Sequence, residues 1–472
     1  MSLTTLSTRC KRYRAILIVL PVTLACMNRA QAIAASKRAT LSPGVGDYPL
    51  PASTLAQWRT ALLSGNDAEK VNAFCMIRQH AWKLFEVVNR PIKLRGNRPS
   101  WMAWYSLVDR PTGKNGQLLK VLQSDSFWLT LSRENLDTSG LEEPALIHVY
   151  LNDFTAEHIR KHHLNELTVL HRQYASGVEN IAQFPRNAIT IKTAWKIIHA
   201  GDCRSIEYWE PSAPNPPFDF LGQPRSTLVI DSETLKNCPT TGVSPQYRVK
   251  DFFSIRISAQ NLKSAMRMAG ETVTLQPGDV IILVGLHMMT KELPSGFWST
   301  FWWSPDGVDL DDRSDMPEKL KRHSYWKHYV MRATIIMENM RDPHGMANKH
   351  RSYSVFNPYI ESMSLQGTQS NCIACHAAAG YGPRSDSGQE YRPRCSTRFE
   401  QLLRTDYVWT VPLHTDSTLT KDHPFRTVIS DIGDKSGENP PGAKLDPYSE
   451  DSNCPGNKMQ YFKPKPDPST SP

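Results

Sequence analysis

The chain has 472 residues, with 55 basic side chains against 46 acidic ones and 40% hydrophobic residues. This length predicts two or three domains, or one large domain with appendages, and the hydrophobic content excludes a wholly disordered chain. Only one apolar run approaches the length of a membrane span, and it lies at the N-terminus, so a protein with several spans is also excluded.

The N-terminus has the three parts of a Sec-type secretory signal peptide. Basic residues lie within 9–14, an apolar run follows over 15–26, and an A-x-A cleavage site ends at Ala32. We expect cleavage near Ala32 and export to the periplasm; an uncleaved anchor and a lipoprotein through Cys26 are the weaker alternatives. Removal of residues 1–32 leaves 50 basic and 46 acidic residues, a net charge of +4 that does not suggest nucleic-acid binding.

Helical patterns come first in the mature chain. Residues 33–57 are small and proline-bearing, so we expect an extended segment there. Apolar residues then recur at helical spacing over about 67–89, with Asn66 or Asp67 as the cap. A second helix is predicted over about 155–175.

Strand patterns dominate the middle of the chain. From Ile189 to Ile197, apolar residues alternate with Lys192 and other polar or small residues, which predicts a half-buried strand. Pro277-Gly-Asp279 predicts a turn before a long apolar run. The further predicted strands span 227–230, 252–258, 272–275, 280–289 and 297–303.

A helix is predicted over about 321–340, and the chain from residue 433 onward lacks apolar periodicity and is predicted to be mostly disordered. The predicted regions are a signal peptide (1–32), a helix-rich N-terminal region (33–180), a β-rich region (181–310), a C-terminal irregular or helical segment that contains Cys372-Ile-Ala-Cys375-His376 (311–432) and a disordered tail (433–472).

The haem assignment comes from Cys372-Ile-Ala-Cys375-His376, a C-x-x-C-H motif that is typical of covalent c-type haem attachment. The two thiols can reach the two vinyl groups of one porphyrin, and His376 then lies under the iron as its proximal ligand. Because haem c is attached outside the cytoplasm, the motif and the signal peptide support each other. The predicted cofactor is one covalently attached haem c.

Two other uses of a C-x-x-C pair have to be weighed. A zinc site needs a second pair of ligands, and Cys395 and Cys454 are poorly spaced for one. A thioredoxin-like dithiol needs a long following helix, which Gly380 and Pro383 prevent. A dithiol or disulfide is therefore the main alternative to haem c.

The remaining mature cysteines are expected to form disulfides in an oxidising compartment. Their odd number leaves at least one free or otherwise paired. Cys203–Cys238 is the pair that we favour, because both flank an irregular proline-rich stretch, although the sequence does not fix the connectivity. The five cysteines are Cys75, Cys203, Cys238, Cys395 and Cys454.

The distal iron ligand is less clearly marked. The only methionine after the motif is Met459, in the predicted tail, so this is not a free-standing small cytochrome c domain and the haem needs walls from upstream residues. We favour His287, at the end of an apolar strand, as the distal ligand; a hydrogen-bonded structural histidine is the other interpretation. Met363 is an alternative ligand, and an open five-coordinate iron is the third option.

Other histidines carry weaker signals. His158 and His162 lie four residues apart on a predicted helix, as metal ligands do. Ile159 stands where the H-E-x-x-H motif needs glutamate, so we favour a solvated polar helix.

Several short sequence segments around the motif resemble those of one group of proteins. They are Gly285-Leu-His287 followed by Lys291, Trp298-Ser-Thr-Phe-Trp302, Asn357-Pro-Tyr-Ile-Glu361, Ser370-Asn-Cys372 with Cys375-His376, and Asp406-Tyr-Val-Trp409. Over about residues 280–412 the chain is similar to uncharacterised bacterial periplasmic cytochrome c family proteins with a single C-x-x-C-H motif. The resemblance implies an exported haem c protein whose haem segment follows a larger domain, and it implies no substrate.

Together these features predict an α+β protein, with a mixed helical and β-rich upstream region and a C-terminal irregular or helical haem c segment. The expected function is one-electron transfer with a periplasmic redox partner protein, without nucleic acid and without a membrane span after signal cleavage. One alternative is a haem-dependent oxidoreductase or peroxidase with an open iron. Another is a redox or gas sensor. No catalytic residue is assigned.

Overall fold

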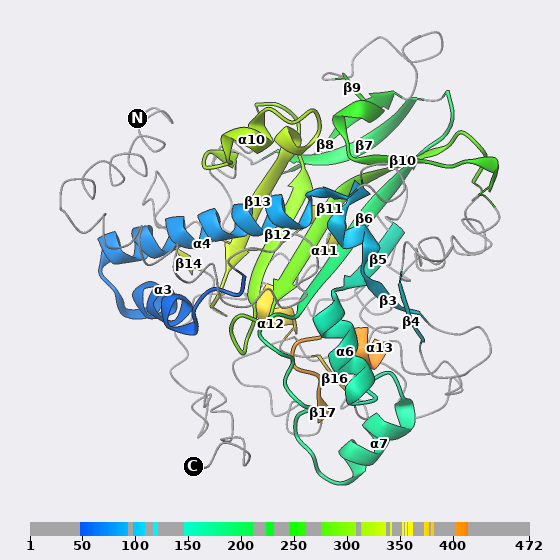
Figure 1. Ribbon diagram of the computed structural model, residues 1–472. Coiled ribbons are helices and arrows are strands. Elements are labelled where there is room, and N and C mark those ends of the chain that lie inside the picture. Colours follow the sequence, from blue (N-terminus) through cyan, green and yellow to red (C-terminus); the bar gives the residue numbers. More distant parts are fainter. Residues whose placement is uncertain are drawn as a thin grey trace, which may run out of the picture.

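The protein is described by a computed structural model that combines helices with antiparallel sheets, so the expected α+β class is confirmed (Figure 1). The described residues are 48–92, 98–108, 117–120, 146–201, 203–210, 223–230, 246–260, 262, 275–307, 313–336, 340–341, 352–353, 355, 357–361, 372–376, 379–381, 403–408 and 410–413. The predicted signal peptide, the predicted tail, Met363 and Met459 lie outside them.

An eight-stranded antiparallel sheet forms the centre of the molecule (Figure 1). Its strand order is β13-β12-β11-β6-β5-β3-β4, with the short β10 also paired to β11. The strands are β3 (Tyr105–Val108), β4 (Gln117–Lys120), β5 (Leu146–Leu151), β6 (Ile189–Ile198), β10 (Ser254–Arg256), β11 (Val280–Thr290), β12 (Phe297–Trp303) and β13 (Tyr329–Thr334).

The central strands β11 and β12 are buried along their whole length. Every residue of both strands is buried because structure covers both faces of the sheet, which explains their almost continuous apolar sequences. In β11 a bulge interrupts the pairing with β6: Leu283 pairs with Trp195, but Gly285 pairs with Ala194. Val284 is therefore an extra residue on the β11 side.

Helices α3 (Ala52–Ser64) and α4 (Asp67–Val88) precede the strands of the sheet in the chain. Helix α4 runs across strands β11 to β13 (Figure 1). A capping box starts α4: the Asn66 side chain accepts from Glu69 N, and the Glu69 carboxylate accepts from Asn66 N. Arg78 anchors the buried face through two hydrogen bonds to Asp315, of 2.7 and 2.9 Å.

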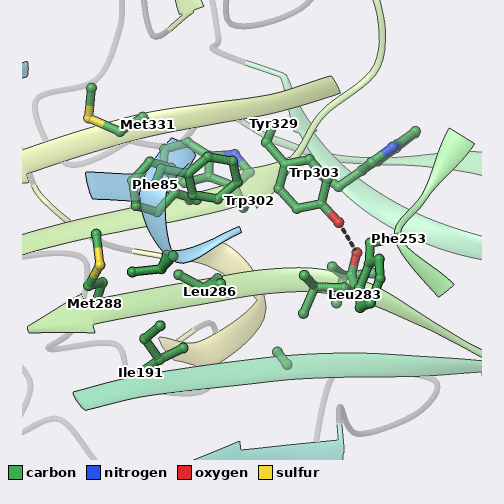
Figure 2. Packing of buried hydrophobic residues seen from close by; sticks show 14 of the residues in the cluster. Phe85, Ile191, Phe253, Leu283, Leu286, Met288, Trp302, Trp303, Tyr329 and Met331 are labelled. Carbon is green, nitrogen blue, oxygen red and sulfur yellow. Dashed lines mark hydrogen bonds between the residues drawn. The ribbon is translucent and has the colours of Figure 1, made fainter. Parts of the chain in front are cut away.

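Aromatic side chains fill the core between α4 and the sheet (Figure 2). Phe85 stacks on Phe301 with ring centroids 4.2 Å apart, and Trp326 meets Phe85 edge-on. Each such pair contributes about 0.5–1.5 kcal/mol beyond the area that it buries. Tyr329 donates its hydroxyl hydrogen to Leu283 O at 2.6 Å, so its polar atom is satisfied inside the core.

A second hydrophobic cluster lies beside the first and joins the chain around residue 372 to the ends of the central strands. It contains side chains of β11, β12 and the two helices α6 and α7, together with the segments 372–381 and 403–411. The elements here are α6 (Asp153–Lys161), α7 (Leu167–Ala175), α12 (Cys372–His376), β16 (Gly380–Tyr381), β17 (Leu403–Arg404) and α13 (Thr410–Leu413).

The remaining elements are short or peripheral. Strands β7 (Cys203–Glu210), β8 (Gln223–Ile230) and β9 (Gln246–Arg248) form a separate sheet, in which β8 and β9 are parallel. The others are β1 (Pro91–Ile92), β2 (Arg98–Pro99), β14 (Met340–Arg341), β15 (Ser352–Tyr353), α10 (Glu318–Lys321), α11 (Pro358–Glu361), η1 (Ser100–Ala103), η3 (Val249–Asp251) and η4 (Trp326–His328).

Three expectations about local structure are wrong. The helix predicted over 321–340 is instead α10, η4 and strand β13, because Tyr329–Thr334 pairs with β12. The helix predicted over 155–175 is divided into α6 and α7, because His163 adopts a left-handed conformation with φ 53° after the end of α6. The segment 33–57 is helical from Ala52 onward.

Candidate haem site

The C-x-x-C-H segment forms the short helix α12, which is attached to the sheet by its first two residues. Cys372 is buried, and its backbone N–H and its Sγ both donate to Val355 O, each at 3.2 Å. Ile373 is fully buried in the second hydrophobic cluster. The side chain of Cys375 lies outside the described part of the chain. The helix is therefore held in place before any cofactor is considered.

His376, the last residue of α12, has its imidazole fixed on one edge. Its Nδ1 lies 2.9 Å from Tyr407 O, and its ring centroid lies 4.3 Å from the Trp298 ring. A carbonyl oxygen only accepts, so Nδ1 carries the hydrogen and Nε2 is the nitrogen that can ligate a metal. Burial lowers the pKa of His376 to about 4, although the bond to Tyr407 O acts in the opposite direction. The imidazole is thus neutral near pH 7.

A tight turn presents the Tyr407 carbonyl to His376. Val408 N donates to Thr405 O at 2.9 Å, and the two central residues both have positive φ, 52° for Asp406 and 67° for Tyr407. Two positive φ values define a type I′ turn. Thr405 N also donates to Ala379 O at 3.0 Å, which ties the turn to the chain just after α12.

The sheet contributes one face of β11 to the site. Alternate residues of a strand point to the same side, so Gly285, His287 and Met289 share a face, and Met289 belongs to the cluster that contains Cys372. His287 pairs with Lys192 of β6 and Thr300 of β12. It is 6% exposed.

The structure brings His287 and His376 into the same neighbourhood. Burial lowers the pKa of His287 well below its ordinary value, and the next largest contribution comes from His376, with Lys192 third. A contribution from His376 to the pKa of His287 requires that the two imidazoles lie within electrostatic range of each other. The histidine of the C-x-x-C-H motif and the favoured distal candidate therefore lie near each other in the fold.

Asn357 lies over Gly285 and holds the segment that precedes α12. Its Nδ2 donates to Thr300 Oγ1 and to Phe301 O, both at 2.9 Å, and its Oδ1 accepts from Tyr359 N at 3.0 Å. A Cβ on Gly285 would lie only 2.8 Å from Asn357 Oδ1, so the glycine is required for this close approach.

Residues of the short sequence segments that carry the resemblance lie close together in this part of the fold. The residues that converge, from segments up to 121 positions apart, are Gly285, His287, Lys291, Trp298, Asn357, Cys372, His376 and Asp406. From the sequence, Lys291 and Asp406 are noted only as members of those segments, without a role. Their ion pair has no local pattern, because it joins positions that are distant in the chain.

The other histidine candidates do not form a metal site. His158 was expected on a solvated helix, but it is 9% exposed and its Nε2 lies 2.9 Å from Ala182 O. Its ring centroid lies 4.4 Å from that of His162. Among the described residues there is no group of three or more His, Cys, Asp or Glu side chains that could hold a metal ion.

The donor set nevertheless fits a haem iron, which takes its proximal ligand from one imidazole and is held covalently by two thiols. Cys372 is the first residue of α12, and His376 has its Nδ1 hydrogen-bonded to a carbonyl, as metal-ligating histidines usually do. Elsewhere, Cys75 and Cys203 are disulfide-bonded, whereas Cys238, Cys395 and Cys454 lie outside the described residues.

Comparison of the chain with models of known protein families, with curated proteins and with solved structures finds no match. Within the part of the chain that the structure describes, no helix is both long enough and apolar enough to cross a membrane.

Proposed function

We propose that this chain is an exported haem c protein that transfers single electrons to or from a periplasmic redox protein. Haem c would be attached through Cys372 and Cys375, with His376 as the proximal ligand. The observation that carries the proposal is the hydrogen bond from His376 Nδ1 to Tyr407 O, in a segment packed against the sheet. A bound haem c would supply a one-electron Fe(III)/Fe(II) couple.

His287 is the residue that we propose as the distal ligand. It lies within electrostatic range of His376 on a fully buried strand, and burial lowers its pKa, which favours the neutral form in which imidazole ligates metals. Its place in β11, between β6 and β12, gives it a fixed direction. Ligands on central strands are held more rigidly than ligands on loops.

Export is supported by two independent features. The N-terminal sequence has the arrangement of a signal peptide. Cys75 and Cys203 are disulfide-bonded, and disulfides are typical of proteins outside the reducing cytoplasm.

The first experiment is to express the full chain in a bacterium that has the haem c maturation machinery. Covalent haem would be detected by haem staining after denaturing electrophoresis and by the pyridine haemochrome spectrum. The matched variants Cys372→Ala and Cys375→Ala should each weaken or abolish the stain. Wild-type protein without covalent haem would contradict the proposal and return the two cysteines to dithiol chemistry.

The ligand state separates electron transfer from the alternatives. Two protein ligands give a low-spin spectrum that carbon monoxide does not change, and His287→Ala should convert it to a high-spin spectrum. His158→Ala, which removes another buried histidine, is the control and should leave the spectrum unchanged. A wild-type high-spin iron that binds carbon monoxide would favour peroxidase or sensor activity instead.

A further inference from the structure

We propose that Lys291 is a positioning residue for the proximal side of the haem: it holds the turn 405–408 so that the Tyr407 carbonyl accepts from His376 Nδ1, and it thereby sets the reduction potential. This inference rests on the proposed haem function. It concerns the residues behind the proximal ligand, and the sequence pattern gives them no role.

Lys291 is enclosed by oxygen atoms. Its side chain is 0% exposed, and its Nζ donates to Asp406 Oδ1 at 2.7 Å, to Pro294 O at 2.6 Å and, more weakly, to Asp406 O at 3.3 Å. Its Nζ also lies 5.3 Å from the centroid of the Tyr407 ring, a cation–π contact. The ammonium of Lys291 thus contacts Asp406 through both its carboxylate and its main-chain carbonyl, and it contacts Tyr407 through its ring. One buried ammonium therefore holds both central residues of the turn.

The turn needs such an anchor. Asp406 and Tyr407 both adopt positive φ, a region that glycine favours and that is a marked outlier for a bulky residue such as tyrosine. Asp406 is fixed from a second side, because its Oδ2 accepts from Phe184 N at 2.8 Å. Backbone conformations of this kind persist only where the surrounding contacts impose them.

The position of the turn controls the proximal imidazole. When a carbonyl accepts the Nδ1 hydrogen of a ligating histidine, the imidazole becomes a more basic ligand. A more basic ligand stabilises Fe(III) relative to Fe(II), and second-shell hydrogen bonding is one of the means by which proteins set the potential of a haem. Loss of the bond from His376 to Tyr407 O should therefore raise the potential.

The test has to separate this effect from the charge of Lys291. Lys291→Met alone would remove a buried positive charge and leave Asp406 without its cation, so its potential would report two effects. The double variant Lys291→Met/Asp406→Asn removes both charges together. Its matched control is Arg78→Met/Asp315→Asn, which removes another largely buried pair, between Arg78 of α4 and Asp315.

The measurements are the midpoint potential of the covalently loaded protein and the paramagnetically shifted NMR signals of the His376 ring. We expect a higher midpoint potential and displaced ring signals in Lys291→Met/Asp406→Asn, and wild-type values in the control. Lys291→Gln/Asp406→Asn, which keeps a neutral hydrogen bond, is the milder variant and should give a smaller rise of the same sign.

A rescue variant tests the positioning step itself. Glycine at 407 keeps the carbonyl and adopts positive φ without strain, so adding Tyr407→Gly to Lys291→Met/Asp406→Asn should return the potential toward the wild-type value. A potential and ring signals equal to wild type in both double variants would overturn the proposal. Wild-type protein without covalent haem would instead refute the proposed function, so the two failures are distinguishable.

Discussion

Asn357 attaches the segment before the C-x-x-C-H motif to the sheet, and its contact with Gly285 permits a quantitative test. Asn357→Ala removes three hydrogen bonds, to Thr300 Oγ1, Phe301 O and Tyr359 N. At about 1 kcal/mol for each bond, the free energy of unfolding should fall by about 3 kcal/mol. Gly285→Ala places a methyl group 2.8 Å from Asn357 Oδ1, and such overpacking costs about 1–3 kcal/mol.

The two substitutions should not be additive. In the Asn357→Ala background the atom that meets the new methyl group is absent, so Gly285→Ala should cost less than about 0.5 kcal/mol there. The assay is urea unfolding of the four members of the cycle, followed by tryptophan fluorescence, with the m values compared to confirm one common transition. An equal cost of Gly285→Ala in both backgrounds would refute the account of this contact.

Three further predictions concern buried ionisable side chains. Arg78→Met should lower the free energy of unfolding by about 3–5 kcal/mol, because it leaves Asp315 largely buried without its cation. Lys319→Met, which breaks a largely exposed pair with Glu86, should lower it by less than about 1 kcal/mol. Equal urea midpoints for the two variants would contradict this. Lys291→Met should destabilise the chain more than Lys291→Met/Asp406→Asn, as measured by thermal unfolding, and the reverse order would show that the charge on Asp406 is not held by Lys291. Burial lowers the pKa of His158 to about 4. Between about pH 6.5 and pH 4 the unfolded chain therefore binds a proton that the folded chain does not, and the free energy of unfolding should fall by about 3 kcal/mol at most as the pH is lowered through this range. His158→Gln should flatten this part of the stability profile, and an unchanged profile would assign the loss to other groups.

The elements that the sequence predicted well are those with a strong local signal. Helix α4 begins at the predicted cap because Asn66 and Glu69 satisfy each other's backbone N–H groups, a pattern that needs only four consecutive residues. Strands β11 and β12 follow from long apolar runs. The strand β13 was predicted as helix because a short apolar segment has no period that separates the two, and pairing with β12 decides its conformation.

The site was predictable in part. The C-x-x-C-H motif identifies its own residues, and the position of His287 at the end of an apolar run made it a candidate. The contacts of Lys291 with Asp406 and of Asn357 with Gly285 join positions 115 and 72 residues apart. No spacing rule connects such positions, so these contacts are visible only in the folded chain.

The bulge at Val284 has a consequence for how this strand can vary. Because the extra residue is inserted on β11 alone, Leu283 and Gly285 oppose consecutive residues of β6 and point to opposite faces of the sheet, although they are two positions apart in the chain. Deletion of Val284 would leave Leu283 opposite Trp195 and Gly285 opposite Ala194 in regular pairing, so His287 would keep its place opposite Lys192 and its face of the sheet. A single-residue deletion at the bulge is thus a milder alteration than one elsewhere in β11, where it would turn every side chain beyond it to the other face of the sheet.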